Sequence, residues 1–181
     1  MAATGKRVLL CGYYGEHNLG DDALLEVALR QLPPAVVPIV TAHDQIQVRE
    51  RFGVATVPRR SLKAVLQTVA QVDALVLGGG SLLQDSTSFR SLLYYAALIL
   101  AARCQGKPVM LWGQGLGPLK RRRSQGLVRA LLPLLQATSW RDPASAALAQ
   151  RLGGQGLVAP DPVWALSRQP WRGRGGPIVV C

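Results

Sequence analysis

Short apolar runs alternate with helix-length segments along most of this chain, and the alternation constrains the fold more than any other feature. The strand-like runs are residues 7–11, 36–41, 54–57, 74–77, 109–112 and 157–159. The helical patterns are residues 22–31, 46–51, 62–70, 91–105, 125–136 and 144–152. Because strands that are apolar on both sides and alternate with helices are typical of covered parallel sheets, we expect an α/β fold with a Rossmann-like parallel sheet flanked by helices. The almost entirely apolar segment 91–105 is expected to be buried.

The C-terminal segment differs in composition from the rest of the chain. Residues 167–176 are rich in Pro, Gly and Arg, which is typical of a linker, and residues 177–181 resemble the beginning of a buried strand. We therefore expect one lobe over residues 1–166, a linker over 167–176 and the start of a second lobe at 177–181.

Composition narrows the class of protein. Hydrophobic residues make up 49% of the 181 residues and charged residues 17%, which is typical of a globular chain. The longest apolar run, residues 92–102, is far shorter than the roughly 20 residues that span a bilayer, and no signal-peptide core follows the N-terminal basic pair. Cys11, Cys104 and Cys181 lie far apart without metal-ligand spacing. We expect a cytoplasmic protein without a disulfide framework or a metal site.

The chain is strongly basic, with a formal net charge of +11. Such a charge favours anionic partners, but no nucleic-acid-binding module or set of aromatic platforms accompanies it, so we expect no nucleic-acid partner. The densest basic run is Lys120-Arg121-Arg122-Arg123. A solvated surface face explains this run, and the alternative is contact with an acidic, lipid-linked substrate at a membrane surface.

The segment "GYYGEHNLGDDALL" follows the first predicted strand. Its glycines fit neither of the common phosphate-loop spacings, and Asp21 and Asp22 lie at the expected helix start, where they would cap the helix and repel a phosphate. We expect Asn18, Gly20 and Asp21 to bind substrate hydroxyl groups or to hold the turn itself. His17 is a weaker candidate for a general acid or base, because a lone loop histidine is usually solvated.

The segment "LVLGGGSLLQD" follows the predicted strand at 74–77. Three consecutive glycines allow close backbone approach and can present N–H groups to an anion, so Gly79, Gly80 and Ser81 are candidate binding residues. Gln84 and Asp85 lie just beyond them. A tight strand-to-helix turn without a ligand would also require these glycines.

Two later loops add polar candidates. Gln114 stands between two glycines in "WGQGLGP", where its amide is placed to recognise a substrate. Arg141 and Asp142 follow a tryptophan, and Asp161 follows the last predicted strand. Asp142 precedes a proline, which favours an N-cap role for its side chain.

The acidic side chains share one property, because five of the ten follow predicted strands: Asp21, Asp22, Asp85, Asp142 and Asp161. In a parallel sheet the carboxyl ends of the strands lie on one edge, where ligands bind. We therefore expect these carboxylates to form a polar rim for a hydroxyl-rich ligand, together with Asn18, Ser81, Gln84, Gln114 and Arg141.

Four segments, taken in order, resemble the polysaccharide pyruvyl transferase family, and within it the CsaB-like branch. They are "GYYGEHNLGDDALL", "VLGGGSLLQDSTSFRSLLYY", "GKPVMLWGQGLGPL" and "RDPASAALAQRLG…APDPVWAL", and the resemblance covers residues 7–166. It implies the N-terminal lobe of a GT-B-like, two-lobed fold. It also implies transfer of pyruvate from phosphoenolpyruvate, the donor substrate, to a sugar of a cell-wall or surface polysaccharide, forming a ketal and releasing phosphate.

The resemblance further implies that no metal or other cofactor takes part, and that the acceptor is a saccharide or polysaccharide. Together with the basic charge, it leaves open a lipid-linked acceptor and peripheral contact with a membrane. The donor-binding arginines and the catalytic histidine of the family lie mainly in its second lobe, so no catalytic residue is assigned here. Two alternatives stay open: a GT-B glycosyltransferase that uses a nucleotide sugar, and a non-catalytic remnant of a longer enzyme.

Overall fold

The computed structural model describes residues 5–86 and 88–167, which form seven strands, six α-helices and two 3-10 helices. The strands are β1 (Lys6–Tyr14), β2 (Val36–Ala42), β3 (Ala55–Pro58), β4 (Ala74–Gly78), β5 (Val109–Gln114), β6 (Ala137–Trp140) and β7 (Leu157–Val158). The α-helices are α1 (Leu19–Gln31), α2 (Gln45–Phe52), α3 (Leu62–Gln71), α4 (Phe89–Cys104), α5 (Arg122–Leu131) and α6 (Pro143–Arg151). The 3-10 helices are η1 (Leu132–Leu134) and η2 (Pro162–Ala165).

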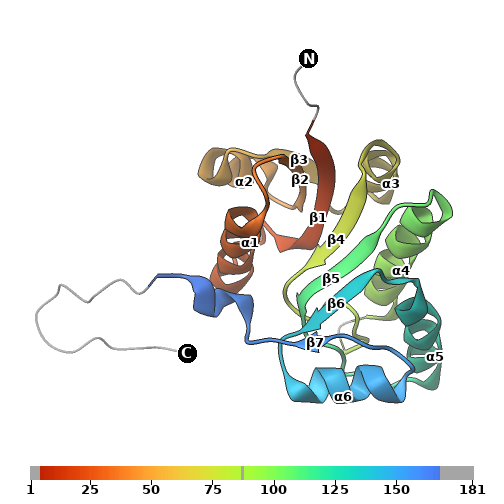
Figure 1. Cartoon of the computed structure of the whole chain (residues 1–181). Helices are drawn as coiled ribbons and strands as arrows, with labels where there is room; N and C mark the ends of the chain where they lie inside the picture. Colours follow the sequence, from red (N-terminus) through yellow and green to blue (C-terminus); the bar gives the residue numbers. More distant parts are fainter. Residues whose placement is uncertain (1–4, 87, 168–181) are drawn as a thin grey trace, which may run out of the picture.

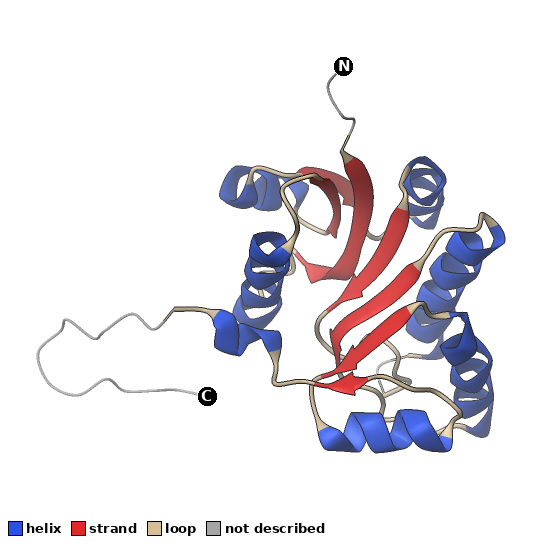
Figure 2. Ribbon diagram, viewed as in Figure 1, coloured by secondary structure: helices blue, strands red, loops and turns tan. Residues whose placement is uncertain are grey.

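All neighbouring strands pair in parallel, in the order β3-β2-β1-β4-β5-β6-β7. Figures 1 and 2 show the twisted sheet with helices on both faces. The strand order reverses between β1 and β4, which defines a topological switch point where ligands bind in open α/β sheets. The predicted Rossmann-like parallel sheet is confirmed.

Two hydrophobic cores hold the layers together, one on each face of the sheet. Leu9 and Cys11 of β1 face a core formed with α3, α4, α5 and α6, whereas Val8 and Leu10 face a core formed with α1 and α2. Side chains of a strand alternate between the two faces of a sheet, so β1 must be apolar throughout to be buried on both. This is why the central strands were predictable as apolar runs.

Strand β6 was given no residue range in the sequence analysis, which predicted one helix over residues 125–136 and counted Asp142 among the acids at strand ends without defining the strand before it. The structure has α5, then η1, then β6 with the sequence Ala-Thr-Ser-Trp. Three of these four residues are small or polar, and Trp140, which is only 1% exposed, supplies most of the burial. The strand therefore lacks the aliphatic run that identifies its neighbours.

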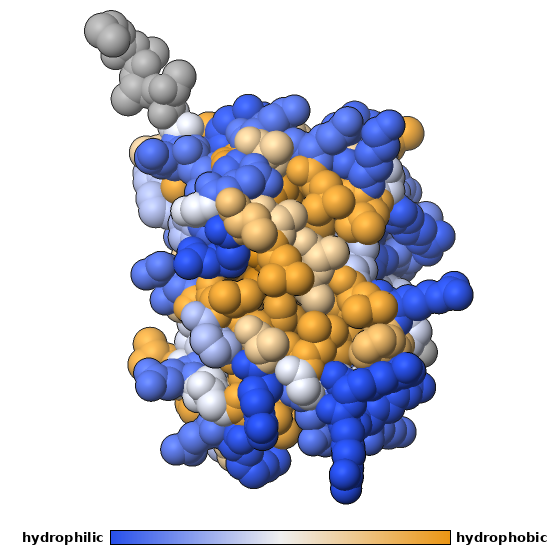
Figure 3. All heavy atoms as spheres, turned by 90° about the vertical axis from the view of Figure 1, so that its right-hand side faces the viewer, coloured by the Kyte–Doolittle hydropathy of each residue, from blue (hydrophilic) through white to orange (hydrophobic). Residues whose placement is uncertain are grey.

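Helix α4 is buried on one side only, so the expectation that the whole segment is buried is wrong. Leu92, Leu98 and Ile99 are fully buried, but Leu93 and Leu100 are each 45% exposed. Figure 3 shows the face of the molecule on which α3, α4 and α5 lie, where a hydrophobic zone is bordered by hydrophilic residues.

The described chain ends after η2, which packs against α1. The predicted linker beyond Ser167 and the predicted start of a second lobe lie outside the described residues, so the proposed domain boundaries stay predictions. Over residues 5–86 and 88–167, no helix is both long enough and apolar enough to cross a membrane.

Candidate functional site

An open pocket of about 770 Å³ lies beyond the carboxyl ends of β1 and β4, at the switch point of the sheet. Seven of the ten predicted binding residues line it: Asn18, Gly20, Asp21, Gly80, Ser81, Gln84 and Arg141. It is also lined by Asp161, which was predicted as part of the polar rim. The other lining residues were not predicted: Tyr13, Leu24, Arg59, Leu82, Ser88, Ser91, Tyr95 and Val163. The topology thus gathers residues from β1, from α1 and the turn before it, from the loops after β3, β4 and β6, from α4 and its N-cap, and from η2 with the residue before it.

Asn18 shapes the turn between β1 and α1. It is the N-cap of α1, and its side-chain oxygen accepts a hydrogen bond from the backbone N–H of Gly20 at 2.9 Å. The prediction that Asp21 and Asp22 cap this helix is therefore wrong, because both lie within its first turn. Carboxylates in a first turn are still favoured by the helix dipole.

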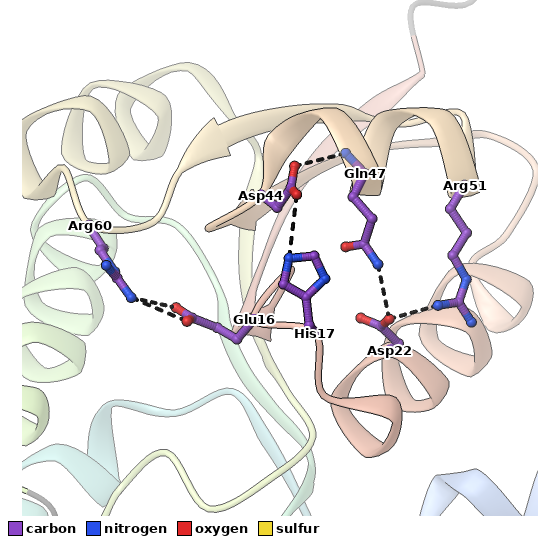
Figure 4. Close-up of polar contacts among 7 residues, drawn as sticks. All are labelled: Glu16, His17, Asp22, Asp44, Gln47, Arg51 and Arg60. Atoms are coloured by element: carbon purple, nitrogen blue, oxygen red, sulfur yellow. Dashed lines mark hydrogen bonds and ion pairs between the residues drawn. The ribbon is translucent and has the colours of Figure 1, made fainter.

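Asp22 is buried and ties α1 to α2 (Figure 4). Its Oδ2 atom accepts hydrogen bonds from Arg51 at 2.7 Å and from Gln47 at 3.4 Å. The side chain is only 3% exposed, so this carboxylate is committed to a structural ion pair. It does not line the pocket.

Asp21 instead lines the pocket and is half-buried there. Burial and the neighbouring Asp22 carboxylate raise its pKa, and the positive charges of Arg59 and Arg141 partly oppose this shift. Among the described residues, none donates a hydrogen bond to the Asp21 carboxylate. The group is therefore a hydrogen-bond acceptor that lines the pocket, within the electrostatic influence of Arg59 and Arg141.

Arg59 is the main pocket residue that the sequence analysis missed. It follows β3, forms an ion pair with Glu16, and its Cζ atom lies 3.9 Å from the centre of the Tyr13 ring. Burial alone would lower the pKa of Arg59, but Tyr95, Glu16 and Tyr13 together raise it. Arg60 extends the contact to Glu16 at 3.2 Å (Figure 4). The signal that could have found Arg59 was its position directly after the predicted strand at 54–57.

Arg141 connects three loops on the other side of the pocket. Its guanidinium donates to Ser81 Oγ at 3.1 Å and lies 3.4 Å from the Asp161 carboxylate. Gly115 makes this possible, since a Cβ atom there would lie 2.4 Å from Ser81 Oγ and 3.1 Å from Arg141 Nε. Asp161 also accepts a hydrogen bond from the backbone of Val163 and so begins η2.

Gly79 and Gln114, both predicted to bind substrate, do not line the pocket. The Gly79 N–H, one of the predicted anion donors, donates to the Trp112 carbonyl at 2.8 Å. Gln114 is 1% exposed, and its amide donates to the Gly79 carbonyl and accepts from the Leu82 N–H. These contacts brace the loop after β4 against the end of β5.

Asp85 is also placed away from the pocket lining. It accepts hydrogen bonds from the backbone N–H groups of Lys120 at 2.8 Å and Arg121 at 2.9 Å. These bonds help to lower the pKa of its carboxyl to about 2. Asp142 is likewise structural, because it caps α6 through Ser145, as its position before a proline predicted.

His17 lies outside the pocket lining. Its backbone has a φ of 57°, and its ring nitrogen lies 3.6 Å from the Asp44 carboxylate, with the side chain 69% exposed (Figure 4). In the part of the chain that is described, no group of three or more His, Cys, Asp or Glu side chains is arranged to hold a metal ion.

The parallel strand order and the polar pocket at the switch point define a Rossmann-like lobe with a candidate site at its strand ends. The sequence model of the polysaccharide pyruvyl transferase family matches residues 18–177, and the chain belongs to this family. Membership of the CsaB-like branch stays a prediction. No curated protein sequence matches the chain significantly.

Solved structures of sugar-handling proteins share the fold. HepE from Anabaena, solved with UDP and glucose, aligns with a TM-score of 0.52 at 14% identity over 85% of this chain and 44% of HepE. A Listeria monocytogenes protein described as a UDP-N-acetylglucosamine 2-epimerase aligns with a TM-score of 0.51 at 16% identity over 83% of this chain and 43% of its own. The chain spans less than half the length of these proteins, and the similarity confirms a GT-B-like lobe.

Proposed function

We propose that this lobe belongs to a transferase that moves pyruvate from phosphoenolpyruvate to a saccharide acceptor, and that the switch-point pocket binds the acceptor. Family membership supports the reaction class. The observation that carries the assignment of the pocket is the Asp21 carboxylate, which lines the pocket together with Arg59 and Arg141 and accepts no hydrogen bond from the described residues. Sugar hydroxyls are the natural donors to such a carboxylate.

The chemistry of ketal formation explains why a half-buried carboxylate such as Asp21 suits the binding of the acceptor hydroxyl groups. Two acceptor hydroxyl oxygens form bonds to C2 of the donor, and the bond from C2 to the phosphate oxygen breaks. One hydroxyl proton ends on C3, which becomes a methyl group, and the other leaves with phosphate. Because burial raises the pKa of Asp21, its carboxylate binds a hydroxyl proton more strongly than an exposed carboxylate does.

Ser81 and Arg141 complete the proposed acceptor site. The Ser81 hydroxyl and the Arg141 guanidinium are already joined at 3.1 Å, so their positions are fixed before a ligand arrives. The pocket volume of about 770 Å³ is within the usual range for small-molecule sites. The donor-binding arginines and the catalytic histidine are proposed for the second lobe, and the reaction is proposed to need no metal or other cofactor.

The test uses the full-length protein, with phosphate release from phosphoenolpyruvate measured with and without a saccharide acceptor. We expect Asp21→Asn to raise the acceptor KM by about 10- to 100-fold, as for loss of a hydrogen bond to a charged group, and to change the phosphoenolpyruvate KM by less than about twofold. An equal rise in both constants would remove the acceptor role from Asp21.

A nucleotide-sugar glycosyltransferase is the second candidate, because the solved HepE structures contain UDP with glucose or UDP-glucose. Turnover that requires a nucleotide sugar, without phosphate release from phosphoenolpyruvate, would favour it. Saccharide binding without either reaction would identify a non-catalytic remnant. The proposed location is the cytoplasm, with a lipid-linked acceptor at the membrane.

A further inference from the structure

The outer side of α4 presents an apolar stripe to solvent. Leu93 and Leu100 are each 45% exposed, and Ala97, between them, is half-buried. These positions follow the spacing of one helical face, and we call them the α4 stripe. The neighbouring helices add the half-buried Leu66 of α3 and Leu127 of α5. Figure 3 shows the resulting hydrophobic zone on this face of the molecule.

The same region of the chain is basic and has no acidic residues. Between Asp85 and Asp142 the sequence contains no Asp or Glu and nine Lys or Arg residues: Arg90, Arg103, Lys107, Lys120, Arg121, Arg122, Arg123, Arg129 and Arg141. Helix α3 also lacks acidic residues and carries the exposed Lys63. An ordinary solvated helix face mixes both signs of charge, whereas this one does not.

Contacts link the basic residues directly to the start of α4. The Arg123 guanidinium of α5 lies over the Phe89 ring of α4, at 4.2 Å from its centre. Arg90 is exposed one turn before Leu93, and Arg122 and Arg129 are exposed on α5. Cations therefore border exposed leucines on helices that pack against one another.

The combination of exposed leucines and unbalanced cations selects the kind of partner. Two copies of this face would bring arginines against arginines, so charge opposes a symmetric dimer through it. An anionic bilayer offers phosphates to the guanidinium groups and an apolar layer to the leucines. We propose that the outer face of α3, α4 and α5 docks on an anionic membrane surface.

The position of α4 gives this contact a consequence for the pocket. Ser91 and Tyr95 of the same helix line the pocket, so docking through Leu93 and Leu100 holds the pocket beside the bilayer. The inference does not depend on the identity of the reaction, because membrane binding is measured without turnover.

The test is co-sedimentation of the full-length protein with vesicles of phosphatidylcholine containing 30% phosphatidylglycerol, or of phosphatidylcholine alone, at low and high salt. We expect binding to the anionic vesicles only, weakened by salt. The double variant Arg122→Glu/Arg129→Glu should bind at least about 30-fold more weakly, since each basic residue near an anionic surface contributes about 1 kcal/mol. Leu93→Ser/Leu100→Ser should also weaken binding, because it removes the inserted apolar groups.

Matched controls separate this face from net charge and general hydrophobicity. Arg49→Glu/Arg151→Glu makes the same change of charge on α2 and α6, and Ile46→Ser removes an apolar side chain of α2 that is 62% exposed. We expect both controls to bind like the original protein. Equal weakening by the controls, or equal binding to neutral vesicles, would overturn the proposal. So would a loss of self-association in the α4 variants without any vesicle binding, which would identify an interface between copies.

Discussion

Asp21 and Asp22 are adjacent in the sequence, but α1 places their carboxylates in different environments. Asp22 is buried in an ion pair with Arg51, whereas Asp21 lines a pocket that Arg59 and Arg141 also line. At the scale of single residues, the composition of the site therefore depends on which polar side chains are already engaged in structural hydrogen bonds or ion pairs, and which are left to line the pocket. Gln114 is the clearest case, because its amide suggested substrate recognition and the structure gives it buried backbone partners.

We predict that Gln114→Ala lowers the free energy of unfolding by about 2–4 kcal/mol, because it leaves the Leu82 N–H and the Gly79 carbonyl without their partner. Urea denaturation of the full-length protein measures this change. Gln125→Ala is a matched control, since that amide also bonds a backbone carbonyl, at 3.0 Å, but from an exposed position. Unchanged stability with a selective rise in acceptor KM would instead restore a recognition role for Gln114.

At the scale of elements, five α-helices begin at a residue whose side chain accepts a backbone N–H of the first turn: Asn18, Asp44, Ser61, Ser88 and Asp142. Helix α5 begins at Arg121 without such a cap. Asp85, from the loop after β4, accepts the N–H groups of Lys120 and Arg121 instead. A residue distant in sequence thus fixes the start of α5.

This contact predicts a specific pH dependence. Folding lowers the pKa of Asp85 from about 3.9 in an unfolded chain to about 2. The carboxylate therefore contributes stability that is fully present above about pH 4 and is lost as the pH falls toward 2. Denaturation midpoints measured between pH 5 and pH 2 should fall less steeply for Asp85→Asn than for the original protein. Glu26→Gln, which removes an i,i+4 ion pair with the exposed Arg30, should leave the slope nearly unchanged. Equal slopes for all three proteins would contradict the assigned role of Asp85.

Most elements were predictable because of how they are buried. Strands β1, β4 and β5 separate two layers of helices and so consist largely of apolar residues, whereas β6 relies on Trp140 and left no comparable pattern. The topology also explains why Asp21, Ser81 and Arg141 meet, since each follows a parallel strand. Strand order alone cannot tell whether a polar side chain at a strand end faces a ligand or braces the next loop. The direction of such a side chain depends on neighbours that are distant in sequence. For this reason Gln114 and Asp85 were expected at the ligand site, although the structure places them outside the pocket lining.

At the scale of the whole molecule, the described chain has two cores and a seven-stranded parallel sheet, and it spans less than half the length of the solved structures that share its fold. In the proposed two-lobed enzyme, we expect the second lobe to face this pocket, which lies beyond the strand ends. The proposed acceptor site and the proposed donor site would then lie on different lobes.

We predict that a fragment of residues 1–166 folds on its own, because the residues that form its two apolar clusters all lie between Val8 and Leu152. It should unfold cooperatively in urea and bind saccharide weakly, yet release no phosphate from phosphoenolpyruvate. Circular dichroism and a phosphate assay test the two halves of this prediction. Turnover by the fragment would place the catalytic groups in this lobe, contrary to our assignment.

Helix α4 connects the pocket to the outer face of the molecule, and this connection has a consequence for binding. Tyr95 lies on its inner side and Leu93 on its outer side, so a partner that shifts this rigid helix also shifts the Tyr95 ring and the Arg59 group beside it. Membrane binding at the outer face and saccharide binding in the pocket are then linked thermodynamically, and the linkage must be reciprocal. If vesicles tighten saccharide binding, saccharide must tighten vesicle binding by the same factor. Titrating each ligand in the presence of the other would measure one coupling free energy twice.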